Sequence, residues 1–194
     1  MVFSVIKFMN KIPRVGIDVD GVLRDFRPRL RSVYLGVYPD HNVPALHEWT
    51  SFDLHLYFPI GEEVYDFFTL QHPRAIYLGA DPYQGAVEFM KELYGFTELS
   101  IVTAPINDNT KKFTERWLEL NQMHYHELVF SNDKTDYKGD YLLDDSEGVL
   151  KRVKKTGNAI PVCFRQLWNQ TWSTDPIVNS YQEFLHLVRN GKRL

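Results

Sequence analysis

The segment RVGIDVDG, residues 14–21, is a short apolar run that leads into a DxDG sequence. Such a run is typical of a buried strand that delivers its last side chains to a loop. Four further segments have the composition of strands: residues 98–102, 126–130, 141–143 and 159–164. Apolar residues recur at helical spacing in residues 84–94, 110–122, 147–155 and 181–189. This alternation predicts an α/β fold, with a Rossmann-like, mostly parallel sheet of five strands and helices packed on it.

Residues 28–80 do not follow the alternation, because they are rich in proline, glycine and aromatic residues and contain no convincing strand. A connection of this length is too long for a plain loop inside a compact domain. We therefore expect an inserted, small and mainly helical cap at residues 28–80, with residues 1–27 and 81–194 forming the α/β core. Most aromatic side chains of the cap should form its own core, and some are candidates for stacking on a base.

The composition is that of an ordinary globular protein, with 194 residues, 44% of them apolar, and a net charge of −3. This charge argues against a polyanion-binding protein, so a nucleic-acid partner is not favoured, although a local basic patch can still bind one. No apolar run approaches the ~20 residues of a membrane span, and residues 1–12 lack the cleavage site of a secretory signal. Cys163 is the single cysteine, which suits a reducing compartment. We therefore expect a cytoplasmic protein without a membrane partner.

Acidic or hydroxyl side chains follow three of the predicted strands. They are Asp18 and Asp20, then Thr103, then Asp144 and Asp145. Because the carboxyl ends of parallel strands open on one edge of a sheet, we expect these side chains to converge. Several carboxylates in one crevice need a cation, or raised pKa values, to coexist. All-oxygen ligands suit Mg²⁺, so the sequence predicts a magnesium-dependent phosphate site.

The same residues resemble the four motifs of the haloacid dehalogenase superfamily, in the family's order. DVDGVL at residues 18–23 looks like the nucleophile motif, and Thr103, Lys134 and Asp144-Asp145 look like the other three. The runs DVDGVLRDF, IVTAP, NDKT and GDYLLDD are similar to the 5'(3')-deoxyribonucleotidase branch, whereas the cap matches it poorly. Each motif alone has an ordinary structural explanation, such as a surface turn, a helix cap or a solvated lysine. The set of four, each at its expected place, is what carries the resemblance.

The resemblance implies a role for each acidic residue. Asp18 would attack phosphorus to form an aspartyl-phosphate, and Asp20 would act as general acid and then as general base. Mg²⁺ would be held by Asp18, by the backbone carbonyl of Asp20 and by Asp145. Asp144 would orient this site or bind the metal through water.

The resemblance also implies which residues bind the substrate. The Thr103 hydroxyl and the Lys134 ammonium would contact the phosphate, with the backbone N–H of Ala104 close by. Phe26 occupies a position that lines the base pocket in the resembling branch. Two residues depart from that branch: it has a small residue where this chain has Arg24, and a serine where it has Ala104. The loss of the serine hydroxyl should weaken phosphate binding without abolishing it.

A basic cluster, Arg24, Arg27, Arg29 and Arg31, follows the nucleophile motif. The favoured interpretation is a solvated helix face paired with nearby acids. The other is a landing site for a second phosphate or for a nucleic-acid backbone.

We therefore expect a magnesium-dependent phosphomonoester hydrolase whose small-molecule substrates are (deoxy)nucleoside monophosphates. One alternative is a phosphatase that acts on the ends of nucleic acids or on another small phosphorylated metabolite. Another is a non-catalytic nucleotide-binding protein of the same fold. The sequence leaves open the base, the choice between a 5' and a 3' phosphate, and the oligomeric state.

Overall fold

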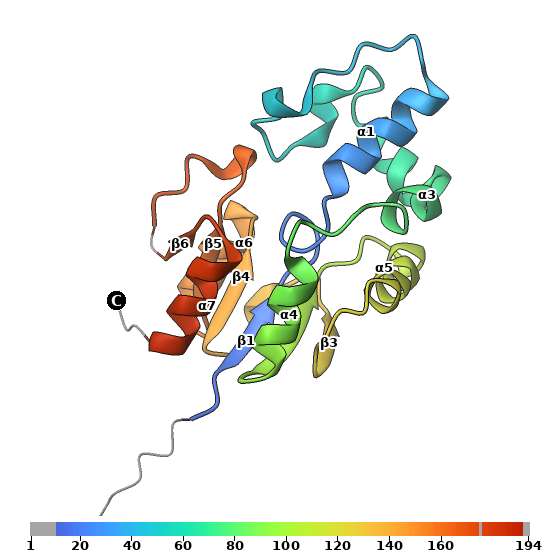
Figure 1. The fold of residues 1–194 in the computed structure, drawn as a ribbon. Helices are drawn as coiled ribbons and strands as arrows, with labels where there is room; N and C mark the ends of the chain where they lie inside the picture. The colour runs from blue at the N-terminus through green and yellow to red at the C-terminus, as the bar shows by residue number, and fades with distance from the viewer. Residues whose placement is uncertain (1–10, 175, 192–194) are drawn as a thin grey trace, which may run out of the picture.

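One parallel sheet of six strands, in the order β3-β2-β1-β4-β5-β6, forms the centre of the molecule (Figure 1). The computed structural model describes residues 11–174 and 176–191. Residues 1–10 lie outside the described part, and they include the predicted start of the core and most of the segment that lacks a predicted secretory signal. The strands are β1 Arg14–Ile17, β2 Glu98–Thr103, β3 Glu127–Phe130, β4 Tyr141–Asp144, β5 Ile160–Phe164 and β6 Ile177–Val178.

The α/β, Rossmann-like prediction is confirmed, and each of the five predicted strands occurs. The sixth strand, β6, was not predicted. It contains two residues and pairs with the last two positions of β5 at the edge of the sheet. A strand this short has no periodicity that sequence analysis can detect.

Helices cover both faces of the sheet, since neighbouring residues of a strand point to opposite sides. In β4, Leu143 packs into a cluster with residues of α4 Ala86–Tyr94 and α7 Tyr181–Asn190. Leu142 instead packs with Val153 of α6 Glu147–Thr156 on the other face. The remaining core helix, α5 Asp108–Leu120, contributes Trp117 to the α4–α7 side. These four helices are the ones that the helical spacing predicts.

A second hydrophobic cluster lies beyond the carboxyl ends of the strands, in the upper part of Figure 1. It is built from α1 Phe26–Val37 and a series of short helices: η1 Leu46–Glu48, η2 Leu54–Tyr57, α2 Glu63–Asp66, η3 Phe67–Gln71 and α3 Pro73–Tyr77. Its core is mostly aromatic, as in the stacked pair Trp49 and Tyr57, whose ring centroids are 5.0 Å apart. We call residues 28–80 the cap segment. α3 at its end packs against α5 of the α/β core.

None of the helices in the described part of the chain combines the length and the hydropathy that crossing a bilayer requires.

Candidate active site

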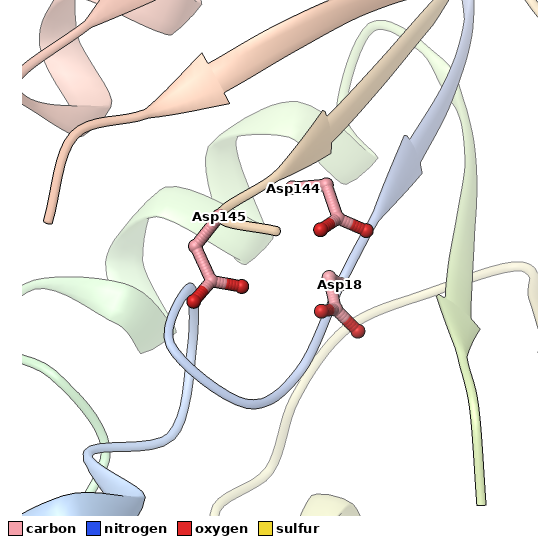
Figure 2. A group of neighbouring side chains, drawn as sticks. All are labelled: Asp18, Asp144 and Asp145. Atoms are coloured by element: carbon pink, nitrogen blue, oxygen red, sulfur yellow. The ribbon is translucent and has the colours of Figure 1, made fainter. Parts of the chain in front are cut away.

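The pairing of two neighbouring strands brings three acidic residues together. β1 and β4 are parallel partners, with Ile17 opposite Leu143. The residues that follow, Asp18 and Asp144, therefore reach the edge of the sheet side by side, and Asp145 comes next along the chain. Oxygens of these three buried carboxylates lie within 4.8 Å of one another (Figure 2). The parallel-sheet argument predicts this convergence for Asp18, Asp144 and Asp145, and it also predicts Asp20 and Thr103 nearby.

Lys134 lies in the same cluster and compensates part of its charge. It begins a single helical turn, η4 Lys134–Asp136. Its Nζ is 2.7 Å from Asp18 Oδ1 and 2.7 Å from Asp144 Oδ2. Burial lowers the pKa of Lys134, but the two carboxylates outweigh burial and raise that pKa above its ordinary value. Lys134 is therefore a permanent cation in the cluster.

One ammonium group cannot balance three carboxylates. Burial raises the pKa of Asp18 to about 7, an effect that Lys134 opposes and Asp144 reinforces. Burial, followed by the charges of Asp144 and Asp18, also raises the pKa of Asp145. The donors of the cluster are all oxygens, and with its three carboxylates and one ammonium all ionised the cluster carries two surplus negative charges. This donor set and charge fit a divalent cation such as Mg²⁺.

Asp20 lies outside this group, because Arg24 holds its carboxylate. Arg24 Nε is 2.7 Å from Asp20 Oδ1, and Nη2 is 2.9 Å from Oδ2. The Arg24 side chain is fully buried, with its guanidinium 4.8 Å from the ring centroid of Tyr77 and 5.1 Å from that of Trp117. The Asp20 side chain is 42% exposed and faces the cavity described below. The first DxDG aspartate thus joins the cluster, and the second is held beside it.

Gly21 completes this loop because only glycine fits its position. Its φ is +80°, and a Cβ atom on it would collide with the Asp145 carboxylate. The loop that carries Asp18 and Asp20 can therefore pass close to Asp145.

A cavity of about 370 Å³ opens between the sheet edge and the cap segment. One end is polar and includes Asp18, Asp20, Asp145, Lys134 and Thr103. Thr103 is the last residue of β2, next to β1, and is buried, whereas the following Ala104 is exposed at the rim. The remaining walls are mostly aromatic and aliphatic, and they include Phe26, Phe52, Leu54, Tyr65, Phe68, Tyr77, Tyr83, Ile106, Val149 and Trp168.

Phe26, which the resemblance places at the base pocket, lies on the wall of this cavity. Its ring centroid is 5.3 Å from that of Phe68 and 5.3 Å from that of Tyr77. Both partners belong to the cap segment, so the cap segment and the α/β core together shape the apolar end of the cavity.

The favoured interpretation of the arginine cluster as a solvated helix face is wrong. Arg24 is fully buried, and Arg27 is 8% exposed. Arg29 donates to the Ala75 carbonyl at 2.8 Å, and Arg31 donates to the carbonyls of Pro44 and Val43 at 2.9 and 3.0 Å. The rest of the cap segment folds back over α1, and carbonyl groups of residues 43–44 and of α3 accept hydrogen bonds from these arginines. Sequence spacing alone does not reveal that the chain returns over this face.

Trp168 is a cavity residue that the sequence analysis missed. It lies in η5 Leu167–Asn169, between β5 and β6, and its Nε1 donates to Asp145 Oδ2 at 2.6 Å. The rule that residues after parallel strands meet at one edge also applies to β5, so residues 165–172 were candidates for the site. They contain no acidic side chain, so the pattern of acidic strand ends does not include them.

Comparisons with known proteins find similar sequences. A family model described as 5' nucleotidase, deoxy (pyrimidine), cytosolic type C protein matches residues 10–194. The human cytosolic type 5'(3')-deoxyribonucleotidase is 26% identical over 149 residues, which are 73% of this chain and 74% of the human protein.

Solved structures show a similar fold. A haloacid dehalogenase-like hydrolase from Streptococcus pneumoniae has a TM-score of 0.66 at 14% identity, over 90% of this chain and 97% of that one. A magnesium-bound HAD-hydrolase from Bacillus subtilis has a TM-score of 0.60 at 15% identity, over 92% of this chain and 99% of that one. At these identities the likeness establishes the fold alone.

Proposed function

We propose that this chain, which belongs to the family described as 5' nucleotidase, deoxy (pyrimidine), cytosolic type C protein, hydrolyses (deoxy)nucleoside monophosphates. In this proposal it acts as a phosphatase of the haloacid dehalogenase superfamily, with Mg²⁺ as its cofactor. The observation that carries the proposal is the division of one cavity into two ends. Its polar end has the charges for a phosphate and a divalent cation, and its aromatic end has the flat surfaces for a base.

In the proposed mechanism, Asp18 is the nucleophile. Its carboxylate attacks phosphorus, forming the Asp18–phosphorus bond as the bond to the ester oxygen breaks, and Asp20 protonates that oxygen. Asp20 then accepts a proton from the water that hydrolyses the aspartyl-phosphate. Lys134, 2.7 Å from Asp18 Oδ1, is placed to stabilise charge on the phosphoryl group, and Thr103 to donate a hydrogen bond to it.

The contacts of the two fourth-motif aspartates support different roles for them. Asp144 is occupied on both oxygens, since Oδ2 pairs with Lys134 and Oδ1 accepts from the Ser146 backbone N–H at 2.8 Å. Asp145 uses Oδ2 to accept from Trp168, whereas its Oδ1 accepts no hydrogen bond from any of the described residues. We therefore assign the metal to Asp18, Asp145 and the backbone carbonyl of Asp20, with Asp144 orienting Lys134. The bound cation would supply positive charge to the phosphate oxygens.

The cap segment is proposed to select the leaving group, with residues 1–27 and 81–194 as the catalytic core. Aromatic stacking is worth about 1–3 kcal/mol per base, or one to two powers of ten in affinity. Phe26, Phe68 and Tyr77 are placed to provide it at the apolar end of the cavity. The proposal includes a small-molecule nucleotide as the partner and a cytoplasmic location, which the human cytosolic relative supports. The four arginines are engaged within the protein, which disfavours a nucleic-acid substrate.

The test is a panel of phosphomonoesters assayed with Mg²⁺ and with excess chelator. We expect kcat/KM for thymidine or deoxyuridine monophosphate to exceed that for glucose 6-phosphate and glycerol phosphate by at least tenfold, and activity to require the metal. Asp18→Asn should abolish turnover. More than about a tenth of wild-type activity in that variant would refute the covalent mechanism, because loss of a nucleophile costs several powers of ten. Equal rates on nucleotides and sugar phosphates would refute the assigned substrate class.

A further inference from the structure

Trp168 connects two parts of the site that are far apart in the sequence. Its indole N–H donates to Asp145 Oδ2 at 2.6 Å, and its ring forms part of the cavity wall. The loop around it is held firmly, because the fully buried Asn169 donates to the carbonyls of Asp145 and Phe164 at 2.8 and 2.9 Å. The indole therefore meets Asp145 in a defined orientation.

The Trp168 ring also contacts Arg27, and Arg27 in turn contacts the cap segment. The Arg27 guanidinium lies 3.6 Å from the centroid of a Trp168 ring, which is a close cation–π stack. The same guanidinium donates to the carbonyl of Ser51 at 3.0 Å and to those of Trp49 and Phe52 at 3.5 Å. Arg27 is 8% exposed, so water competes little for these contacts. A continuous series of contacts thus runs from Asp145, through Trp168 and Arg27, to residues 49–52.

We propose that Trp168 is a positioning residue that orients the metal ligand Asp145 and couples it, through Arg27, to residues 49–52 of the cap segment. The inference rests on the proposed function for the identity of Asp145 as a metal ligand. A donor on Oδ2 fixes the rotation of the carboxylate and leaves Oδ1 for the cation. Loss of such an outer contact typically weakens metal binding 10–100-fold.

The first experiment separates the indole N–H from the bulk of the ring. Trp168→Phe retains an aromatic ring and removes the donor. Trp172→Phe is the matched control, since Trp172 lies on the same loop, is also largely buried, and donates to the Thr174 carbonyl instead of to the cluster. Calorimetric titration with Mg²⁺ alone should show binding weakened at least tenfold in Trp168→Phe and within twofold of wild type in Trp172→Phe. Unchanged binding in Trp168→Phe, or equal losses in both variants, would overturn the proposal.

The second experiment tests the coupling to the cap. Arg27→Met keeps an apolar stem and removes the cation, so hydrogen exchange of residues 49–52 should accelerate and Mg²⁺ binding should weaken about threefold or more. In a Trp168→Leu background, Arg27→Met should leave Mg²⁺ affinity unchanged, because the connection is already broken. Equal losses in both backgrounds would show that the two residues act independently and would overturn the coupling. If Trp168→Leu fails to fold, the same comparison is made in Trp168→Phe, where the missing N–H already breaks the connection.

These measurements distinguish the inference from the proposed function. They follow metal binding and backbone exchange, which need no substrate. A protein that binds Mg²⁺ as expected but hydrolyses no nucleotide would refute the proposed function and leave this inference standing.

Discussion

Replacing the proposed nucleophile should make the metal-free protein more stable. Asp18→Asn keeps the size of the side chain and removes a negative charge from a buried cluster of three carboxylates and one lysine. Burial raises the pKa of Asp18 from its ordinary value of 3.8 to about 7, so the folded protein holds this proton more tightly than the unfolded chain. Ionisation of Asp18 therefore opposes folding.

The size of the effect follows from the pKa difference. One pKa unit corresponds to about 1.4 kcal/mol, so ionised Asp18 lowers the free energy of unfolding by about 4 kcal/mol at pH 8. This penalty is absent below about pH 4, grows as the pH rises, and levels off above about pH 7. At pH 5 it is roughly a third of its value at pH 8. For a chain of this length, the gain in Tm of Asp18→Asn should be on the order of 10 °C at pH 8 and about a third of that at pH 5.

Thermal unfolding in excess chelator, at pH 5 and at pH 8, measures both values. Asp133→Asn is the control, because Asp133 is an exposed carboxylate in the loop beside Lys134, and hydrogen bonds from Thr135 hold its pKa below the ordinary value. The control should show no gain. Saturating Mg²⁺ should shrink the advantage of Asp18→Asn, since the wild type alone binds the metal through this carboxylate. A variant no more stable than wild type at pH 8 without metal, or a gain independent of pH, would refute the electrostatic argument.

Three further outcomes are expected. Arg24→Met should lower kcat for nucleotides at least tenfold, because Asp20 loses both of its hydrogen bonds to the guanidinium. In an Asp20→Asn background, Arg24→Met should have little further effect on kcat. A full additional loss in that background would mean that Arg24 acts through packing. Chelation should abolish activity and Mg²⁺ should restore it. Ca²⁺ should bind and inhibit, because its larger and looser coordination misplaces the phosphate. Activity retained in excess chelator would contradict the assignment of Asp145 as a metal ligand. Phe26→Ala should lower kcat/KM for a deoxynucleotide at least tenfold more than for glycerol phosphate, and equal losses on the two substrates would show that Phe26 only packs the cap.

Arg24 illustrates how a correct observation can lead to a wrong expectation. The sequence shows an arginine where the resembling branch has a small residue, and three more basic residues follow at short spacing. Read along the chain, such a cluster is typical of a solvated face. In the folded protein the Arg24 guanidinium lies between Tyr77 and Trp117, which are 53 and 93 positions away. Only a tertiary arrangement brings those rings around it.

The α/β core and the acidic residues at its edge are recognisable from local sequence patterns. Buried parallel strands are short apolar runs, and their side chains alternate between two helix-covered faces, so residues 14–17, 98–103 and 141–144 are recognisable locally. Asp18, Asp144 and Asp145 could be placed together because parallel pairing puts strand ends on one edge, whatever the details of packing.

The way in which that edge is enclosed depends on contacts between distant segments. The cap segment has short, irregular helices, and its contacts join residues that no local pattern relates. Trp168 and Arg27 are separated by 141 positions and meet at 3.6 Å, and Gln166 reaches back to the Gly21 carbonyl at 2.7 Å. A buried strand is recognisable from its own residues, and regular hydrogen bonding between parallel strands then aligns the strand ends. Side-chain contacts such as that between Trp168 and Arg27 depend instead on how whole segments pack against one another. The acidic edge is therefore readable from the chain, whereas the cavity above it forms only in the fold.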